Sequence, residues 1–173
     1  MQQNFQLIKL IPASLPLVKL LKKLLKNKVV GISSSGGHLT ELQTAIPKEL
    51  IKKITYVTSK DGRTIESLYN LNHFFISEPN GVKWKYIINF LQAVILFLKL
   101  RPLVVISTGS GLAIPFLLIC KFFGSKIIFI ESGARIYTAS KSGKFMYKYS
   151  DVFIVQYKNL LKFYPNAIIA SLN

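Results

Sequence analysis

The fold is decided by residues 29–38, VVGISSSGGH, in which a short apolar run leads into a loop of serines and glycines. A run of this kind is typical of a strand that is buried on both faces of a sheet. A helix starting directly after the loop would direct its free N–H groups and the positive end of its dipole toward a bound anion. The glycines lack the spacing of the dinucleotide fingerprint or of the P-loop, so neither NAD nor ATP is indicated.

Outward from this stretch, short runs rich in Val, Ile and Phe alternate with helical patterns. The predicted strands are residues 29–33, 54–58, 73–76, 103–107, 126–130 and 152–155, and the predicted helices are residues 39–47, 62–69, 82–100, 112–123, 143–149 and 158–163. This alternation predicts a Rossmann-like α/β fold, a mostly parallel sheet covered by helices on both faces. A length of 173 residues leaves room for one such domain, residues 28–173, after an amino-terminal segment, residues 1–27.

The charge of the chain is strongly positive. It has 23 Lys and Arg residues against 7 Asp and Glu residues, a formal net charge of +16. This surplus indicates an anionic partner: nucleic acid, an acidic membrane surface or a phosphorylated substrate. The sequence carries no signature of a nucleic-acid-binding module, so we expect no nucleic acid partner. The single cysteine, Cys120, lies in an apolar run, and we expect it to be a small buried hydrophobe.

The amino-terminal segment, residues 1–27, has the pattern of a basic amphipathic helix. Leucines and lysines recur at helical spacing on two different faces, namely Leu17, Leu20, Leu21 and Leu24 on one and Lys19, Lys22 and Lys23 on the other. Such a helix can lie in a bilayer interface with its lysines on anionic lipid headgroups. The alternative is a first helix packed on the domain's own core. The apolar run 86–98 is shorter than the roughly 20 residues of a membrane-spanning helix, so we expect a core helix or one lying in the interface.

Three loops after predicted strands are candidate sites, because ligands bind beyond the carboxyl ends of the strands in such a sheet. They are residues 33–38, 107–111 and 131–135. Small residues and N–H donors in the first two can contact a diphosphate, although a purely structural turn explains the second loop equally well. The candidate substrate-binding residues of the three loops are Ser35, Gly36, Gly37, Ser107, Gly109, Ser110 and Arg135.

Two residues are candidate catalytic groups. The His38 ring can take a proton from a sugar hydroxyl or hydrogen-bond a phosphate near neutral pH, and the alternative is a histidine that only caps or packs at a helix start. Glu131 ends an apolar strand in a chain with few acidic residues, so we expect it to have a partner. Arg135 can pair with it in an internal salt bridge or bind a phosphate oxygen. The other histidine, His73, opens a predicted strand and is expected to be structural.

Three segments resemble the acceptor-side subunit of split glycosyltransferases: residues 33–42 (SSSGGHLTEL), 105–124 (VISTGSGLAIPFLLICKFFG) and 126–165. This family includes the membrane-anchoring subunit of the eukaryotic enzyme that adds the second N-acetylglucosamine to dolichol-linked chitobiose, and bacterial capsule and exopolysaccharide counterparts. It is similar to the amino-terminal half of the peptidoglycan N-acetylglucosaminyltransferase, which has the two-domain GT-B fold.

The resemblance implies that a separate sugar-nucleotide-binding subunit supplies most of the donor site. It implies that His38 and Glu131 face the cleft between the two halves, and that Gly36, Gly37, Ser107, Gly109 and Arg135 shape the loops around it. It further implies an inverting transfer without a metal or other cofactor, with a UDP-sugar as donor substrate.

The resulting hypothesis is a subunit that, with its partner, transfers a hexose from a UDP-sugar to a polyprenyl-diphosphate-linked saccharide in capsule or exopolysaccharide biosynthesis. We expect it at the cytoplasmic face of the cell membrane, attached peripherally or monotopically to anionic lipid. The alternative is a non-catalytic membrane adaptor that recruits and activates the catalytic subunit.

Overall fold

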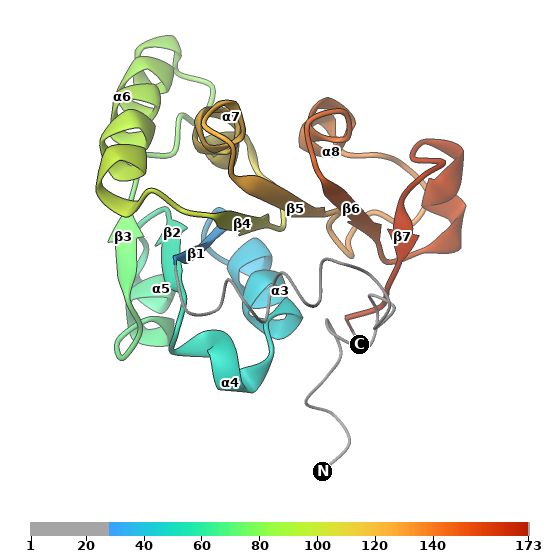
Figure 1. Cartoon of the computed structure of the whole chain (residues 1–173), viewed down its shortest axis with the longest axis horizontal. Coiled ribbons are helices and arrows are strands. Elements are labelled where there is room, and N and C mark those ends of the chain that lie inside the picture. The colour runs from blue at the N-terminus through green and yellow to red at the C-terminus, as the bar shows by residue number, and fades with distance from the viewer. Residues whose placement is uncertain (1–27, 173) are drawn as a thin grey trace.

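A seven-stranded sheet forms the centre of the computed structural model, which describes residues 28–172 (Figure 1). Every strand runs parallel to its neighbours, in the order β3-β2-β1-β4-β5-β6-β7. The strands are β1 (Val29–Ile32), β2 (Thr55–Thr58), β3 (His73–Phe75), β4 (Val104–Ser107), β5 (Lys126–Ile130), β6 (Val152–Val155) and β7 (Ile168–Ile169). The apolar residues of β1, β4 and β6 are buried along their whole length, as expected for central strands of a parallel sheet.

Helices cover both faces of this sheet (Figure 1). One face carries α3 (Gly37–Ala45), α4 (Lys48–Ile51) and α5 (Gly62–Ser67), and the other carries α6 (Lys83–Leu100), α7 (Ile114–Phe122) and α8 (Lys141–Met146). Two 3-10 helices, Gly111–Ala113 and Lys158–Lys162, complete the described elements. The sheet therefore separates two cores, one built on Leu39 and Leu42 of α3 and the other on Ala93 of α6 and Phe116 of α7.

The order of the strands places a switch point between β1 and β4. From β1 the chain moves through β2 to β3 on one side, and from β4 through β5 and β6 to β7 on the other. At the switch point the register pairs Ile32 with Ser107, so the loops that follow β1 and β4 leave the sheet side by side. In doubly wound sheets the crevice at this position is where ligands bind.

The predicted α/β class, the parallel sheet and its cover on both faces are confirmed. The segment 158–163, predicted as a helix, contains the 3-10 helix Lys158–Lys162, and the predicted helix 112–123 is a 3-10 turn that continues into α7. The sequence analysis missed α4 and β7, which have only four and two residues and thus too little periodicity to detect. The predicted amphipathic segment, with Leu17, Leu20, Leu21, Leu24, Lys19, Lys22 and Lys23, lies outside the described residues.

Candidate functional site

Three loops that are far apart in the sequence meet around Gly109. A Cβ atom added to Gly109 would lie 3.8 Å from Cε1 of His38 and 3.5 Å from Oγ of Ser142. His38 stands in the first turn of α3, directly after the β1 loop, whereas Ser142 stands in the first turn of α8, after the β5 loop. The structure thus brings the loops after β1, β4 and β5 together at the carboxyl edge of the sheet.

The loop after β1 is fastened to the neighbouring strand by Ser59. The Ser59 hydroxyl accepts a hydrogen bond from the Ser35 backbone N–H at 3.0 Å and donates one to the Ser35 hydroxyl at 3.1 Å. Gly36 then turns the chain into α3 with a φ of 74°, which only glycine adopts without strain. Gly36 and Gly37 are exposed at the start of this nine-residue helix, so its amino terminus is open to an anion.

His38 is paired with an acidic residue that the sequence analysis did not single out. The Nδ1 atom of His38 lies 3.8 Å from Oε2 of Glu41, one turn further along α3. Within the described part of the chain, both atoms are buried and make no hydrogen bond. The other oxygen of Glu41 accepts hydrogen bonds from the Gly133 backbone N–H at 2.7 Å and from the Ser132 hydroxyl at 3.2 Å. Glu41 therefore ties the histidine to the loop after β5.

The loop after β4 is hydrogen-bonded to the backbone of the same helix, α3. The Thr108 hydroxyl donates to the His38 carbonyl at 2.7 Å, and the Ser107 hydroxyl accepts from the Gly109 N–H at 3.1 Å. Gly109 and Ser110 both have positive φ values, 104° and 83°. For Ser110 this is an uncommon conformation, and its hydroxyl is buried without a hydrogen-bond partner among residues 28–172. A non-glycine residue held in a strained conformation beside a ligand crevice is a feature of binding loops.

Glu131 has the partner that its position predicted, but the partner is Tyr164. The Tyr164 hydroxyl donates to Oε2 of Glu131 at 2.5 Å, and the Ser140 and Ser132 backbone N–H groups donate to the same carboxylate at 3.2 Å. Glu131 is only 1% exposed. Burial raises the pKa of Tyr164, and the hydrogen bond to Glu131 raises it further. The carboxylate thus fixes both ends of the loop between β5 and α8.

Arg135 stands apart from this network. Its side chain is exposed, and among the described residues no salt bridge joins it to Glu131. The predicted alternative of an internal Glu131–Arg135 salt bridge is therefore wrong, because Glu131 is already satisfied by a tyrosine and by backbone N–H groups. Arg135 remains free to contact an anion from solution. His73 has a structural environment, as expected: its ring packs at a tilt against Phe75 and its Nδ1 contacts the Leu71 carbonyl.

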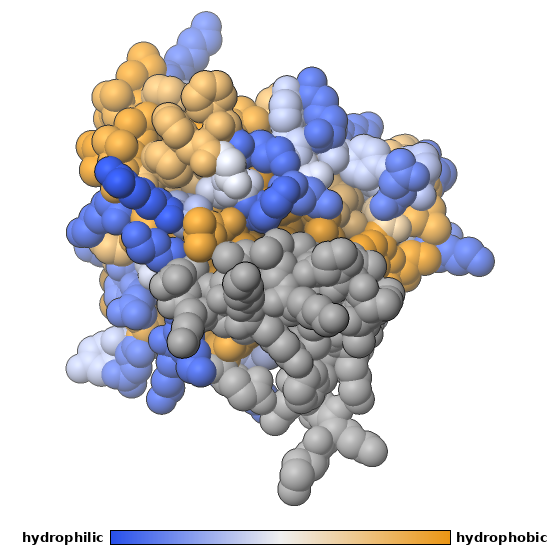
Figure 2. Space-filling view, viewed as in Figure 1, coloured by the Kyte–Doolittle hydropathy of each residue, from blue (hydrophilic) through white to orange (hydrophobic). Residues whose placement is uncertain are grey.

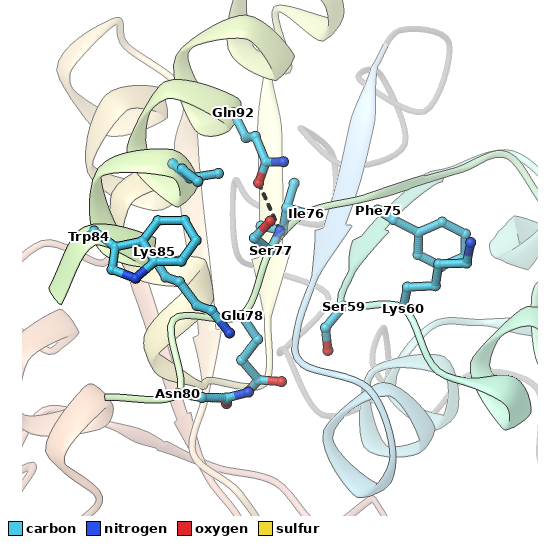
Figure 3. A pocket seen from close by; sticks show the side chains of 11 residues that line it. Ser59, Lys60, Phe75, Ile76, Ser77, Glu78, Asn80, Trp84, Lys85 and Gln92 are labelled. Atoms are coloured by element: carbon cyan, nitrogen blue, oxygen red, sulfur yellow. Dashed lines mark hydrogen bonds between the residues drawn. The ribbon is translucent and has the colours of Figure 1, made fainter. Parts of the chain in front are cut away.

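A hollow of about 480 Å³ opens beside the β1 loop, at the carboxyl ends of β2 and β3. Figure 3 shows Trp84 and Lys85 of α6 on one side of it and Ser59, Lys60 and Phe75 on the other. The Gln92 side chain accepts a hydrogen bond from the Ser77 backbone N–H at 2.8 Å, which holds the loop after β3 against α6. Ser59 contributes to this hollow and also binds Ser35, so the hollow adjoins the first loop.

Taken together, these groups can receive a phosphorylated ligand and move a proton. The His38 side chain is 35% exposed, and the exposed N–H end of α3 lies beside it. Lys60 and Lys85 add positive charge at the neighbouring hollow, where Glu78 is the acidic member of the lining. Within residues 28–172, no cluster of three His, Cys, Asp or Glu side chains is placed to hold a metal ion.

Three contributors to this arrangement were missed by the sequence analysis: Ser59, Glu41 and Tyr164. Glu41 could have been found, because a residue three positions after His38 on a helix lies on the same face. Tyr164 gives no local signal, since it follows Glu131 by 33 residues and reaches it only through the fold. Cys120 is fully buried, as predicted, and burial raises the pKa of its thiol to about 12.

Larger enzymes of known structure share this fold over less than half of their own length. MurG of Acinetobacter baumannii superposes with a TM-score of 0.63 and 17% identity, covering 77% of this chain and 42% of MurG. The UDP-GlcNAc 2-epimerase of Methanocaldococcus jannaschii gives a TM-score of 0.58 and 17% identity, covering 78% of this chain and 42% of the epimerase. The predicted likeness to the amino-terminal half of a GT-B glycosyltransferase is therefore confirmed at the level of the fold.

Curated relatives share more of the sequence. The chain is 33% identical over 172 residues to the Candida albicans protein named UDP-N-acetylglucosamine transferase subunit ALG14. The matched region covers 85% of this chain and 78% of that protein. The human protein of the same name is 34% identical over 76 residues, 40% of this chain and 35% of its own length. Residues 80–172 match the family described as oligosaccharide biosynthesis protein Alg14 like. On this evidence the chain belongs to the Alg14-like family.

Proposed function

We propose that this chain is the acceptor-side subunit of a two-component glycosyltransferase that transfers a sugar from a UDP-sugar to a polyprenyl-diphosphate-linked saccharide at the cytoplasmic face of a membrane. The observation that carries the proposal is the meeting of His38 with the Gly109 loop at the switch point of the sheet. The printed names of the relatives favour N-acetylglucosamine as the transferred sugar. A setting in capsule or exopolysaccharide biosynthesis belongs to the proposal on the ground of sequence resemblance.

His38 is the general base of the proposed reaction. The acceptor hydroxyl oxygen forms a bond to the anomeric carbon, the bond from that carbon to the UDP oxygen breaks, and the hydroxyl proton passes to the ring. Nucleophile and leaving group lie on opposite sides of the carbon, so the configuration inverts. The contact with Glu41 orients the ring by favouring a proton on Nδ1, which leaves Nε2 free to accept the proton.

The hollow beside the first loop is the proposed place of the acceptor's diphosphate. Lys60 and Lys85 flank it, and Trp84 and Phe75 offer apolar surface to the first isoprene units. Its link to Ser35 through Ser59 would place the diphosphate a short distance from the His38 ring, as a saccharide attached to a lipid requires. Arg135 remains a second candidate for phosphate contact.

Glu131 takes a positioning role in this proposal. The Glu131 carboxylate accepts hydrogen bonds from Tyr164 and from backbone N–H groups. Through the N–H of Ser140 it holds the start of α8, where Ser142 lies, beside Gly109. The donor nucleotide is assigned to a separate subunit, because a Rossmann half of this size corresponds to 42% of the MurG chain. The proposed active site is complete only when that subunit closes over the carboxyl edge of the sheet.

The test that separates catalysis from mere recruitment compares two changes in the reconstituted complex. In complex with the sugar-nucleotide-binding subunit, His38→Ala should lower kcat by about 10²- to 10⁴-fold, the usual contribution of a general base. The control is His73→Gln, the other histidine, which should leave turnover unchanged. The adaptor alternative requires the reverse pattern, in which His38→Ala turns over normally and deletion of residues 1–27 abolishes activity.

A further inference from the structure

Helix α6 buries one amide side chain among apolar ones. Its buried residues are the apolar Ala93, Leu96 and Phe97 and the amide Asn89, which is 0% exposed. Large apolar side chains of the same helix face solvent, as Figure 2 shows by the hydrophobic surface over the helix labelled α6 in Figure 1. Burying an amide costs free energy unless it forms hydrogen bonds, and an apolar side chain has no such cost. The contacts of Asn89 therefore indicate what the amide contributes.

The Asn89 side chain joins two segments that are far apart in the sequence. Its Nδ2 atom donates to the Ser77 carbonyl at 2.9 Å and to the Leu112 carbonyl at 3.3 Å. Carbonyl oxygens only accept hydrogen bonds, so the nitrogen of the amide and not its oxygen must face them. The Oδ1 atom is buried and has no hydrogen-bond partner among residues 28–172. The contribution of this residue is therefore its pair of N–H donors.

The first of these segments is the loop after β3, which lines the hollow assigned to the acceptor's diphosphate. Ile76, Ser77 and Glu78 belong to this lining. Gln92, one turn after Asn89 in α6, accepts the Ser77 N–H at 2.8 Å, as the dashed line in Figure 3 marks. Both backbone groups of Ser77 are thus bonded to α6, the N–H through Gln92 and the carbonyl through Asn89. Two amides therefore fix this wall of the hollow.

The second segment is the turn that continues the Gly109 loop. Leu112 lies in the 3-10 helix Gly111–Ala113, whose N-cap is Ser110 with a φ of 83°. A residue other than glycine keeps such a conformation only where the surrounding structure holds it. The bond from Asn89 to the Leu112 carbonyl is one of the contacts that hold this turn. Asn89 is thus connected through the turn to Gly109, the residue that lies beside the His38 ring.

We propose that Asn89 is a positioning residue that sets the separation between the diphosphate hollow and the Gly109 loop. It acts through Ser77 on one side and through Leu112 on the other. This role rests on the proposed function, since the separation matters for turnover only if a diphosphate in the hollow presents its saccharide to His38. A misplacement of about 1 Å between a substrate and a catalytic group can lower a rate by about 100-fold.

Hydrogen exchange of the full-length protein tests the link without any substrate. Asn89→Leu keeps a side chain of similar size and removes both donors, so amide exchange should become at least about tenfold faster in residues 76–80 and 108–113. Gln92→Leu releases the Ser77 N–H alone and should speed exchange only in residues 76–80. Asn89→Ala removes the same donors without added bulk and takes the place of Asn89→Leu if that variant does not fold. Unchanged exchange in residues 108–113 would overturn the proposal.

Ser125→Ala is the matched control for the loss of a buried hydrogen bond. The Ser125 hydroxyl is buried at the amino edge of the sheet and donates to the Pro102 carbonyl at 2.6 Å. Its removal should lower the urea midpoint but leave exchange in both segments unchanged. Faster exchange in residues 108–113 of this control would mean that any loss of stability loosens the turn, and would also overturn the proposal.

Turnover of the reconstituted complex tests the consequence of the link. Asn89→Leu should lower kcat by about 10- to 100-fold and change KM for the acceptor by less than about threefold, because Gln92 still holds the wall of the hollow. Ser125→Ala should leave both constants unchanged. A normal kcat in Asn89→Leu, or a loss no larger than the loss of folded protein, would reduce Asn89 to a structural residue. If the wild-type complex transfers no sugar, the proposed function fails, and the exchange data still decide whether Asn89 links the two segments.

Discussion

One carboxylate, that of Glu41, joins the His38 ring to the loop after β5. Its Oε2 atom lies 3.8 Å from Nδ1 of His38, while its Oε1 atom accepts the N–H of Gly133 at 2.7 Å. The His38 ring on α3 is therefore linked through one carboxylate to the loop after β5. Bringing a base and its orienting carboxylate together is how enzymes set the tautomer of a histidine.

Glu41→Gln should lower kcat of the reconstituted complex by about 10- to 100-fold with little change in KM for the acceptor, because the ring loses its orienting charge but the binding loops remain. The measurement is the initial rate between pH 5 and pH 9. A change in the shape of the pH profile is expected. If Glu41 only stabilises the fold, unfolding will shift but the pH profile will not.

Tyr164→Phe should lower the free energy of unfolding by about 1–3 kcal/mol, since the buried Glu131 carboxylate loses a hydrogen bond that nothing else replaces. Urea denaturation followed by circular dichroism measures the loss. Tyr69→Phe is the matched control, because that hydroxyl lies on an exposed side chain. Equal stability of the two variants would contradict the assigned role of Glu131.

Gly109→Ala should abolish most of the turnover while costing about 1–2 kcal/mol of stability. The added methyl group would occupy the space between His38 and Ser142, and the backbone φ of 104° disfavours alanine. Gly124→Ala is the control for the backbone cost, because Gly124 has a φ of 88° and open space around its Cα. Both variants should lose similar stability, and only the first should lose activity. Comparable kcat values in the two variants would contradict the proposed position of the active site beside Gly109.

Asp151 should make the stability of the protein depend on pH. Burial alone would raise its pKa, but hydrogen bonds from Lys121, the Ile127 backbone and Lys126 outweigh burial and lower it. A carboxyl group whose pKa is lowered on folding stabilises the protein above its unfolded pKa, about 3.9, and this contribution is lost as the pH falls through the folded pKa.

Asp151→Asn should therefore cost about 1 kcal/mol at pH 7, a value reduced by solvent screening at Lys126, and much less near pH 3. Urea midpoints of both proteins across this range measure the difference. Glu66→Gln, an exposed change on α5, provides the comparison. A cost that stays constant between pH 7 and pH 3 would contradict the assigned ion pairs.

The sequence contained enough to predict the sheet, because β1, β4, β5 and β6 are short apolar runs that can be buried only between neighbouring strands. It also indicated the edge of the sheet at which the candidate loops lie, since ligands bind beyond the carboxyl ends of parallel strands. It could not give the partner of Glu131, because Tyr164 reaches it through three-dimensional packing alone. The two residues of β7 likewise become a strand only by pairing with β6.

Helix α6 shows a different limit of prediction from sequence. The apolar pattern of residues 86–98 predicted either a core helix or one lying in an interface, and composition could not decide between them. In the structure Ala93 and Leu96 enter the core, whereas Ile87 and Leu91 are exposed. The side of α6 that is exposed depends on how the helix packs against the core, which the sequence pattern alone does not show.

The central claim is that this chain carries part of an active site that a second subunit completes. The most direct measurement is the rate of sugar transfer from a UDP-sugar to a polyprenyl-diphosphate acceptor as the partner is added to a fixed amount of this chain. The account predicts no transfer by either protein alone and a rate that saturates when the two form a stoichiometric complex. Full-rate transfer by the isolated chain would contradict it.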